Sequence, residues 1–159
     1  MSSTDETTET SAEVPALGTI DMKLEVLTLP VSDVDRTKRF YQSLGWRLDA
    51  DFTAGDAIRG VQFTPPHSQC SIHFGKGLTA ATPGSADRTI LAVTDIDAAR
   101  NDLVSRGVDV SEVYESRPPG FESIEGRSYF TYASFTDPDG NGWLLQEVTT
   151  RIPGREWED

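Results

Sequence analysis

The sequence is poor in cysteine and in basic residues, and each shortage argues against a class of protein. One cysteine, Cys70, cannot form an internal disulfide, so we expect a cytoplasmic protein. The 14 basic residues are outnumbered by 26 acidic ones, and the net charge of −12 disfavours nucleic acid and anionic membranes as partners. No apolar run approaches the roughly 20 residues that cross a bilayer, and residues 1–10 lack the pattern of a secretory signal.

The rest of the composition is that of one ordinary domain with loose ends. The chain has 159 residues, of which 36% are hydrophobic, enough for a packed core. Residues 1–20 are rich in serine, threonine and glutamate, so we predict a disordered acidic tail there. Residues 149–159 form a C-terminal tail with Arg151 and Arg155. It could cover the mouth of a cleft, contact a neighbouring subunit or remain loose.

Hydrophobic periodicity and turn residues predict the same order of elements twice. A strand is expected over 23–31, buried on both faces, and a helix follows with Asp33 as its N-cap and Gly45 as its stop. The second half repeats this order, with a helix capped by Asp95 and stopped by Gly107. The other expected strands cover residues 46–52, 57–64, 71–74, 88–93, 108–114, 128–135 and 143–148.

The two halves of the sequence align at an offset of 62 residues, the spacing from Asp33 to Asp95. The segment 31–35 matches 93–97, and the two helix-stopping glycines also coincide. These matches have structural explanations, so they indicate architecture rather than chemistry. We therefore predict an α+β fold of two tandem βαβββ modules, at about 22–78 and 86–148, forming a curved mixed sheet around a cleft.

Three blocks of sequence carry a family resemblance: LPVSDVDRTKRFYQSLGW at 29–46, AVTDIDAARNDLVSRGVDV at 92–110 and SFTDPDGNGWLLQEVTTRIPGR at 134–155. Together they resemble the vicinal-oxygen-chelate superfamily of glyoxalases, bleomycin-resistance proteins and extradiol dioxygenases, in particular its glyoxalase-like members. The resemblance implies one such domain over 21–155. It also implies a cleft that holds a divalent metal in some members and sequesters drugs without metal in others, and a homodimer, as in many members.

The four metal-ligand positions that the resemblance implies fall here on Val26, His73, Arg88 and Leu144. Valine and leucine have no donor atom, and arginine stays protonated. One histidine does not hold zinc, which takes about four ligands. We therefore expect no cofactor. A divalent metal at non-standard positions is the alternative, with His73, Gln146 and a carboxylate such as Glu25, although Glu25 should face away from Val26 on its strand.

Several residues are candidates for contact with a ligand, and for each of them an ordinary structural role is the alternative. His73 is either a pocket base, and thus the one catalytic candidate, or a strand histidine satisfied by a neighbour. Arg88 is either an anchor for an anion or a solvated residue that precedes its strand. Cys70 is interpreted as a small core residue and Glu147 as outward-facing. The candidate ligand-binding residues are Val26, Thr28, His73, Arg88, Tyr132, Trp143, Leu144 and Gln146.

The first functional hypothesis is a metal-independent pocket for a hydrophobic or aromatic ligand with a polar end, serving binding or catalysis. A drug-sequestering resistance protein is one form of it. The rival hypothesis is a metal-dependent glyoxalase-type lyase, isomerase or dioxygenase with non-standard ligands. A scaffold role is disfavoured, because the cleft implied by the repeat would then have no function. The sequence leaves open whether the protein is an enzyme.

Overall fold

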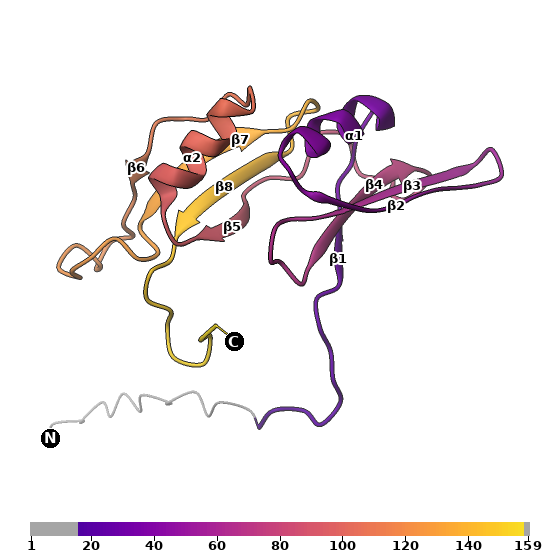
Figure 1. Cartoon of the computed structure of the whole chain (residues 1–159). Helices are drawn as coiled ribbons and strands as arrows, with labels where there is room; N and C mark the ends of the chain where they lie inside the picture. The colour runs from indigo at the N-terminus through magenta and orange to yellow at the C-terminus, as the bar shows by residue number, and fades with distance from the viewer. Residues whose placement is uncertain (1–15, 158–159) are drawn as a thin grey trace, which may run out of the picture.

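The computed structural model describes residues 16–157, and two modules with the same order of elements make up the fold (Figure 1). The predicted tail at 1–20 lies mostly outside these residues. The first module contains β1 (Val26–Thr28), α1 (Val34–Ser43), β2 (Arg47–Ala54), β3 (Ile58–Thr64) and β4 (Ser71–Lys76). The second contains β5 (Thr89–Val93), α2 (Ile96–Ser105), β6 (Tyr114–Glu115), β7 (Thr131–Thr136) and β8 (Gly142–Glu147).

Each module forms one four-stranded mixed sheet, which confirms the α+β prediction. The strand orders are β1-β4-β3-β2 and β5-β8-β7-β6. In both sheets the first strand runs parallel to the last one, and the other pairs are antiparallel. Figure 1 shows each helix on the same side of its sheet, so the opposite face of each sheet has no helix over it. Neither helix of the described residues could cross a membrane.

The helix signals in the sequence act as predicted. The Asp33 carboxylate accepts from the Arg36 amide at 3.0 Å, and the Asp95 carboxylate accepts from the Ala98 amide at 3.0 Å. Gly45 and Gly107 follow the helices with φ of 80° and 88°, a backbone that favours glycine. The capping aspartates and the glycines that recur in the two halves therefore mark where both helices begin and end.

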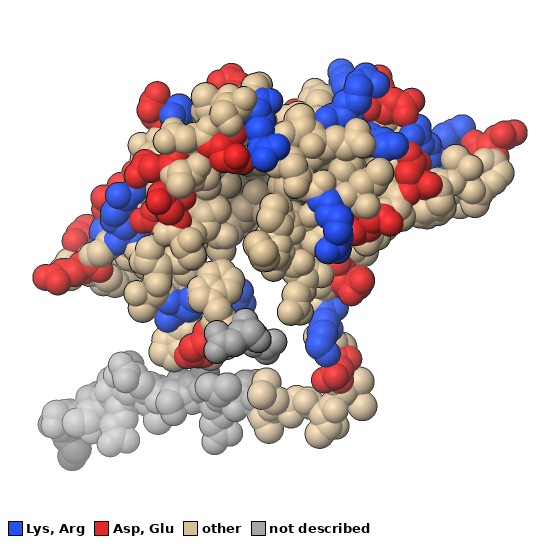
Figure 2. Space-filling model, viewed as in Figure 1, with Lys and Arg blue, Asp and Glu red and all other residues tan. Residues whose placement is uncertain are grey.

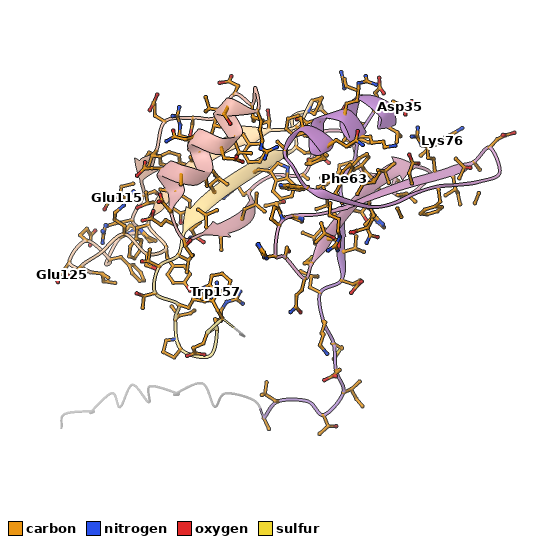
Figure 3. The ribbon with its side chains drawn as sticks, in the orientation of Figure 1. Asp35, Phe63, Lys76, Glu115, Glu125 and Trp157 are labelled. Atoms are coloured by element: carbon orange, nitrogen blue, oxygen red, sulfur yellow. The ribbon has the colours of Figure 1, made fainter. Side chains whose placement is uncertain are left out.

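One hydrophobic core joins the two modules on the helix-covered faces of the sheets. Tyr41 of α1 is fully buried, and its ring lies 6.2 Å from that of Trp143 on β8. Trp46 and Trp143 meet edge to face at 5.2 Å between ring centroids. Figure 3 shows Phe63, which is also fully buried, between α1 and the first sheet. The two modules thus share one core.

Three strand predictions are wrong in extent. The first strand begins only at Val26, and the Leu24 side chain is 67% exposed, so this strand is not buried on both faces. The expected strand over 108–114 is reduced to Tyr114–Glu115. The aromatic strand begins at Thr131 because Tyr129 has a φ of 71°, outside the extended region. Local β propensity does not show where pairing stops.

The prediction for Glu147 is also wrong, because its side chain is 7% exposed. Its carboxylate accepts from the Ile96 amide at 3.0 Å and pairs with Arg127 Nε at 3.2 Å. Glu147 lies on the helix-covered face of β8, beneath the first turn of α2. A carboxylate there satisfies a free amide and the positive end of the helix dipole.

Candidate functional site

The open face of the first sheet carries a row of polar side chains on three paired strands. Thr28, His73 and Gln62 are cross-strand neighbours on β1, β4 and β3. The His73 Nε2 atom lies 2.6 Å from the Thr28 hydroxyl, within hydrogen-bond distance. Partial burial lowers the pKa of His73, which keeps the imidazole neutral at pH 7. This row can accept or donate hydrogen bonds, but it carries no charge at neutral pH.

A second polar group lies next to that row. The hydroxyls of Thr64 and Ser71 are 2.6 Å apart, and Thr64 also donates to the Asp49 carboxylate. The hydrogen bond from Arg47 lowers the pKa of Asp49, with Thr64 as a further donor. The hydrogen bonds of these residues are directed at one another.

The open face of the second sheet carries aromatic side chains beside an amide. Tyr114 and Tyr132 stack across β6 and β7, with ring centroids 5.8 Å apart and an interplanar angle of 24°. The Gln146 amide donates to the Tyr132 hydroxyl and to the Tyr129 carbonyl, both at 3.0 Å. Because Tyr114 is 41% exposed, the tyrosine pair presents a flat apolar surface to solvent.

Arg88 stands at the edge of this surface and lines two adjoining pockets. One, of about 190 Å³, is bounded by Arg88, Tyr114, Ser116, Pro118, Tyr132 and Leu144. The other, of about 450 Å³, includes Asp87, Arg88, Asp109, Ser111, Ser134 and Leu144. The strand starts one residue after Arg88, whose φ of 58° is unusual for a side-chain-bearing residue. The exposed guanidinium is therefore both solvated and part of the pocket wall.

The structure divides the sequence-predicted site residues between the two sheets. Val26, Thr28 and His73 lie in the first, whereas Arg88, Tyr132, Leu144 and Gln146 lie in or next to the second. All lining residues of the two Arg88 pockets come from the second module. The reason is that the modules join through their helix-covered faces, which leaves the two open faces separate within one chain.

Trp143, a candidate for ligand contact, is almost fully buried, although it is among the residues that line the larger Arg88 pocket. Its side chain is 2% exposed, and its indole N–H donates to the Tyr41 hydroxyl at 2.9 Å. Trp143 shares a face of β8 with Leu145 of the core, whereas Leu144 and Gln146 point to the other face. Alternation along the strand therefore directs the Trp143 side chain into the core.

Sequence reasoning missed Tyr114, which completes the tyrosine pair, and the loop residues Ser116 and Pro118. Tyr114 stood at the end of a predicted strand, but its partner on β7 depends on a register that the sequence does not reveal. The Arg117 side chain orders this loop: it donates to the Gly126 carbonyl at 2.7 Å and lies 4.5 Å from the Phe130 ring centroid.

The residues at the implied metal positions do not fit a divalent ion. Only His73 among them has a donor atom, and its Nε2 is in contact with Thr28. His73 and Gln146, from the non-standard set, lie on different sheets. Within residues 16–157 there is no group of three or more histidine, cysteine, aspartate or glutamate side chains that could hold a metal.

Cys70 has none of the features of an activated nucleophile. Burial and the nearby Glu25 carboxylate raise the pKa of its thiol, so the thiolate is disfavoured at neutral pH. Its Sγ atom lies 3.5 Å from the Ser71 carbonyl oxygen. The half-buried thiol is consistent with a structural role.

The comparisons with known proteins decide the family. The model of the Glyoxalase/Bleomycin resistance protein/Dioxygenase superfamily matches residues 23–145. The chain belongs to this superfamily. That confirms the family that the three sequence blocks resemble. No curated protein matches the sequence.

Solved structures of the superfamily resemble the chain over most of its length. TnmS3, an antibiotic binding protein from Streptomyces sp. CB03234, is 29% identical, with a TM-score of 0.63 over 80% of this chain and 97% of that one. A superfamily member from Sphaerobacter thermophilus DSM 20745 is 26% identical, with a TM-score of 0.63 over 80% of this chain and 98% of that one. A glyoxalase/bleomycin resistance protein from the same Streptomyces strain is also 29% identical, with a TM-score of 0.61 over 79% of this chain and all of that one.

Proposed function

We propose that this protein binds a flat aromatic compound with an acidic or polar end, without a metal ion, on the open face of the second sheet. The observation that carries the proposal is the exposed Tyr114–Tyr132 stack, with Arg88 at one edge and Gln146 at the other. A flat ring stacks on tyrosine, and a guanidinium binds an anionic end by paired hydrogen bonds. Among the described residues, those around His73 do not form the set of ligands that a metal ion needs.

Binding, rather than catalysis, is the function that we propose for this site. Among the described residues, those that line the tyrosine pocket include no histidine and no carboxylate, and the His73 imidazole lies on the other sheet. The relationship to TnmS3 supports the choice, because that protein is described as an antibiotic binding protein. A sequestering protein of this kind needs only shape, stacking and one charge contact.

We also propose that two copies form a homodimer in which the open face of a first sheet approaches the open face of a partner's second sheet. Each open face presents only half of the expected cleft. Exposed apolar side chains near the strand edges support pairing: Phe52 is 51% exposed and Ile90 is 48% exposed. Light scattering coupled to size-exclusion chromatography would report twice the chain mass, whereas a monomer at high concentration would contradict the dimer.

The binding proposal is tested by calorimetric titration of the full chain with anthracene-2-carboxylate and its neutral amide. We expect Tyr132→Ala to weaken both probes about tenfold, the upper range for a lost aromatic contact. Arg88→Gln should weaken only the acid, and Arg39→Gln, at an exposed helix position, serves as the matched control. Equal affinity of the wild type and Y132A for both probes would overturn the site. Near-stoichiometric metal in untagged protein would overturn its metal-free character.

A further inference from the structure

A separate pocket of about 750 Å³ lies between the two modules. Its walls are the turn at Pro65, Pro66, His67 and Ser68, the strand β5, the start of α2 and the C-terminal segment. A cavity of about 220 Å³ shares Pro65, Leu91 and Ala99 with it and reaches core residues such as Trp46 and Phe135. The pocket therefore continues inward as an apolar recess, on the other side of β5 from the Arg88 pockets.

The C-terminal segment closes the outer side of this pocket. After β8 the chain curls back beneath the modules, where Trp157 lies (Figures 1 and 3). Ser128 donates its hydroxyl to the Thr150 carbonyl at 2.7 Å, and the Ile152 amide donates to the Tyr129 hydroxyl at 3.1 Å. These bonds hold the start of the segment, and Arg151, Arg155 and Trp157 line the pocket. Figure 2 shows basic atoms beside this segment, below the gap that separates the modules.

Arg151 has an incomplete set of partners. Its guanidinium carbon lies 3.8 Å from the centroid of the Trp157 ring, which covers one face of the group. The Nε and Nη1 atoms are buried and find no hydrogen-bond partner among the described residues. Stacking uses only the face of a guanidinium, so its in-plane N–H groups still need an acceptor. The Asp95 carboxylate in the same wall already caps α2 through the Ala98 amide.

We propose that this inter-module pocket is a second binding site, for an aromatic carboxylate that displaces Trp157 from Arg151. Once Trp157 has left, the guanidinium turns its Nε–Nη1 edge toward the pocket, and the carboxylate accepts in-plane hydrogen bonds from these two atoms, which have no partner among the described residues. The ring of the ligand lies between the Pro66 turn and β5, in the pocket that Trp157 also lines. Trp157 thus competes with the ligand for Arg151. It is 56% exposed at the end of a short segment, so little packing opposes its release.

The test is calorimetric titration of full-length protein with 2-naphthoate and with neutral 2-naphthamide, each in a Tyr132→Ala background that weakens binding at the tyrosine site. We expect 2-naphthoate to bind and the amide to bind at least about tenfold more weakly, because a charge-assisted hydrogen bond is lost. Arg151→Gln should lower the affinity for 2-naphthoate about tenfold or more. Trp157→Ala should raise it, since the competing ring is gone. The Arg39→Gln variant should behave as wild type.

The variants also separate this site from the proposed tyrosine site. Arg88→Gln should leave the Arg151-dependent binding unchanged, so failure of one site does not imply failure of the other. The inference is overturned if 2-naphthoate binds neither wild type nor W157A, or if R151Q retains full affinity. It is also overturned if W157A or R151Q changes the number of chains per particle that light scattering reports, because the C-terminal segment would then belong to an interface between copies.

Discussion

The hydroxyl of Tyr41 donates to the Asp137 carboxylate at 3.1 Å and accepts from the Trp143 indole at 2.9 Å. Tyr41 belongs to α1 of the first module, whereas Asp137 lies in the turn between β7 and β8 of the second. The Asn141 amide in the same turn donates to the Pro30 carbonyl at 2.9 Å. This turn therefore links the two modules through buried hydrogen bonds.

Tyr41→Phe should remove the two hydrogen bonds of the Tyr41 hydroxyl without changing the shape of the core. Asp137 and Trp143 would each lose a partner in a buried place, so we expect the free energy of unfolding to fall by about 1–3 kcal/mol. Burial, with the Asp137 charge, raises the pKa of Tyr41 far above its usual range, so the folded protein keeps the hydroxyl protonated and the loss should be constant from neutral pH up to about 10. Urea denaturation measures the effect, and the exposed Tyr114→Phe is the matched control. Equal stability of Y41F and wild type would contradict this role.

Glu147→Ala should destabilise the second module by removing the acceptor for the Ile96 amide. A lost N-terminal cap of a helix costs about 1 kcal/mol, and the broken pair with Arg127 adds to it. Chemical denaturation of the variant should show this decrease, whereas Glu112→Ala, at a side chain 92% exposed, should change little. If the two variants lose the same stability, Glu147 does not cap α2.

The pH dependence of stability should include a contribution from Asp51. Hydrogen bonds from Arg59 and then Lys38 lower the pKa of Asp51 to about 2. A carboxyl group whose pKa is lowered by folding stabilises the fold above its unfolded value, near 3.9, and loses that contribution as the pH falls toward 2. Because the group is largely solvated, the contribution is at most about 1 kcal/mol.

Carboxyl carbon shifts in NMR spectra measure the pKa of Asp51 directly. Arg59→Gln should raise it toward 3.9, since the first donor is gone. Arg39→Gln should leave it unchanged. An Asp51 that titrates near 3.9 in the wild type would show that the ion pairs with Arg59 and Lys38 are not populated in solution.

Arg117→Gln should loosen the loop at 116–130, which borders the Arg88 pocket. The variant loses the hydrogen bond to Gly126, the contact with Phe130 and the ion pair with Glu115. The loss of a charge-assisted hydrogen bond worth about 1.5 kcal/mol raises the population of molecules in which this loop is open about tenfold. Limited proteolysis within 117–127 should speed up accordingly, and Arg39→Gln should match wild type. An unchanged cleavage rate would mean that other contacts order the loop.

The sequence by itself determined the two modules, their helices and the family. N-caps, helix-stopping glycines and hydrophobic periods act within a few residues, so Asp33, Asp95, Gly45 and Gly107 could be interpreted without tertiary structure. The sequence also indicated that Val26, Arg88 and Leu144 cannot bind a metal, because that follows from their chemistry alone.

Only the tertiary structure decided what the two open faces contain. The pairing of Tyr114 with Tyr132, the burial of Trp143 and the cap made by Glu147 depend on register and on contacts between distant segments. One step along a strand reverses the face of a side chain, and no local signal sets that step for a short strand such as β6. The sequence contains Arg151, but only the tertiary structure shows the pocket that Arg151 lines with β5. Two of its buried nitrogen atoms have no hydrogen-bond partner within residues 16–157.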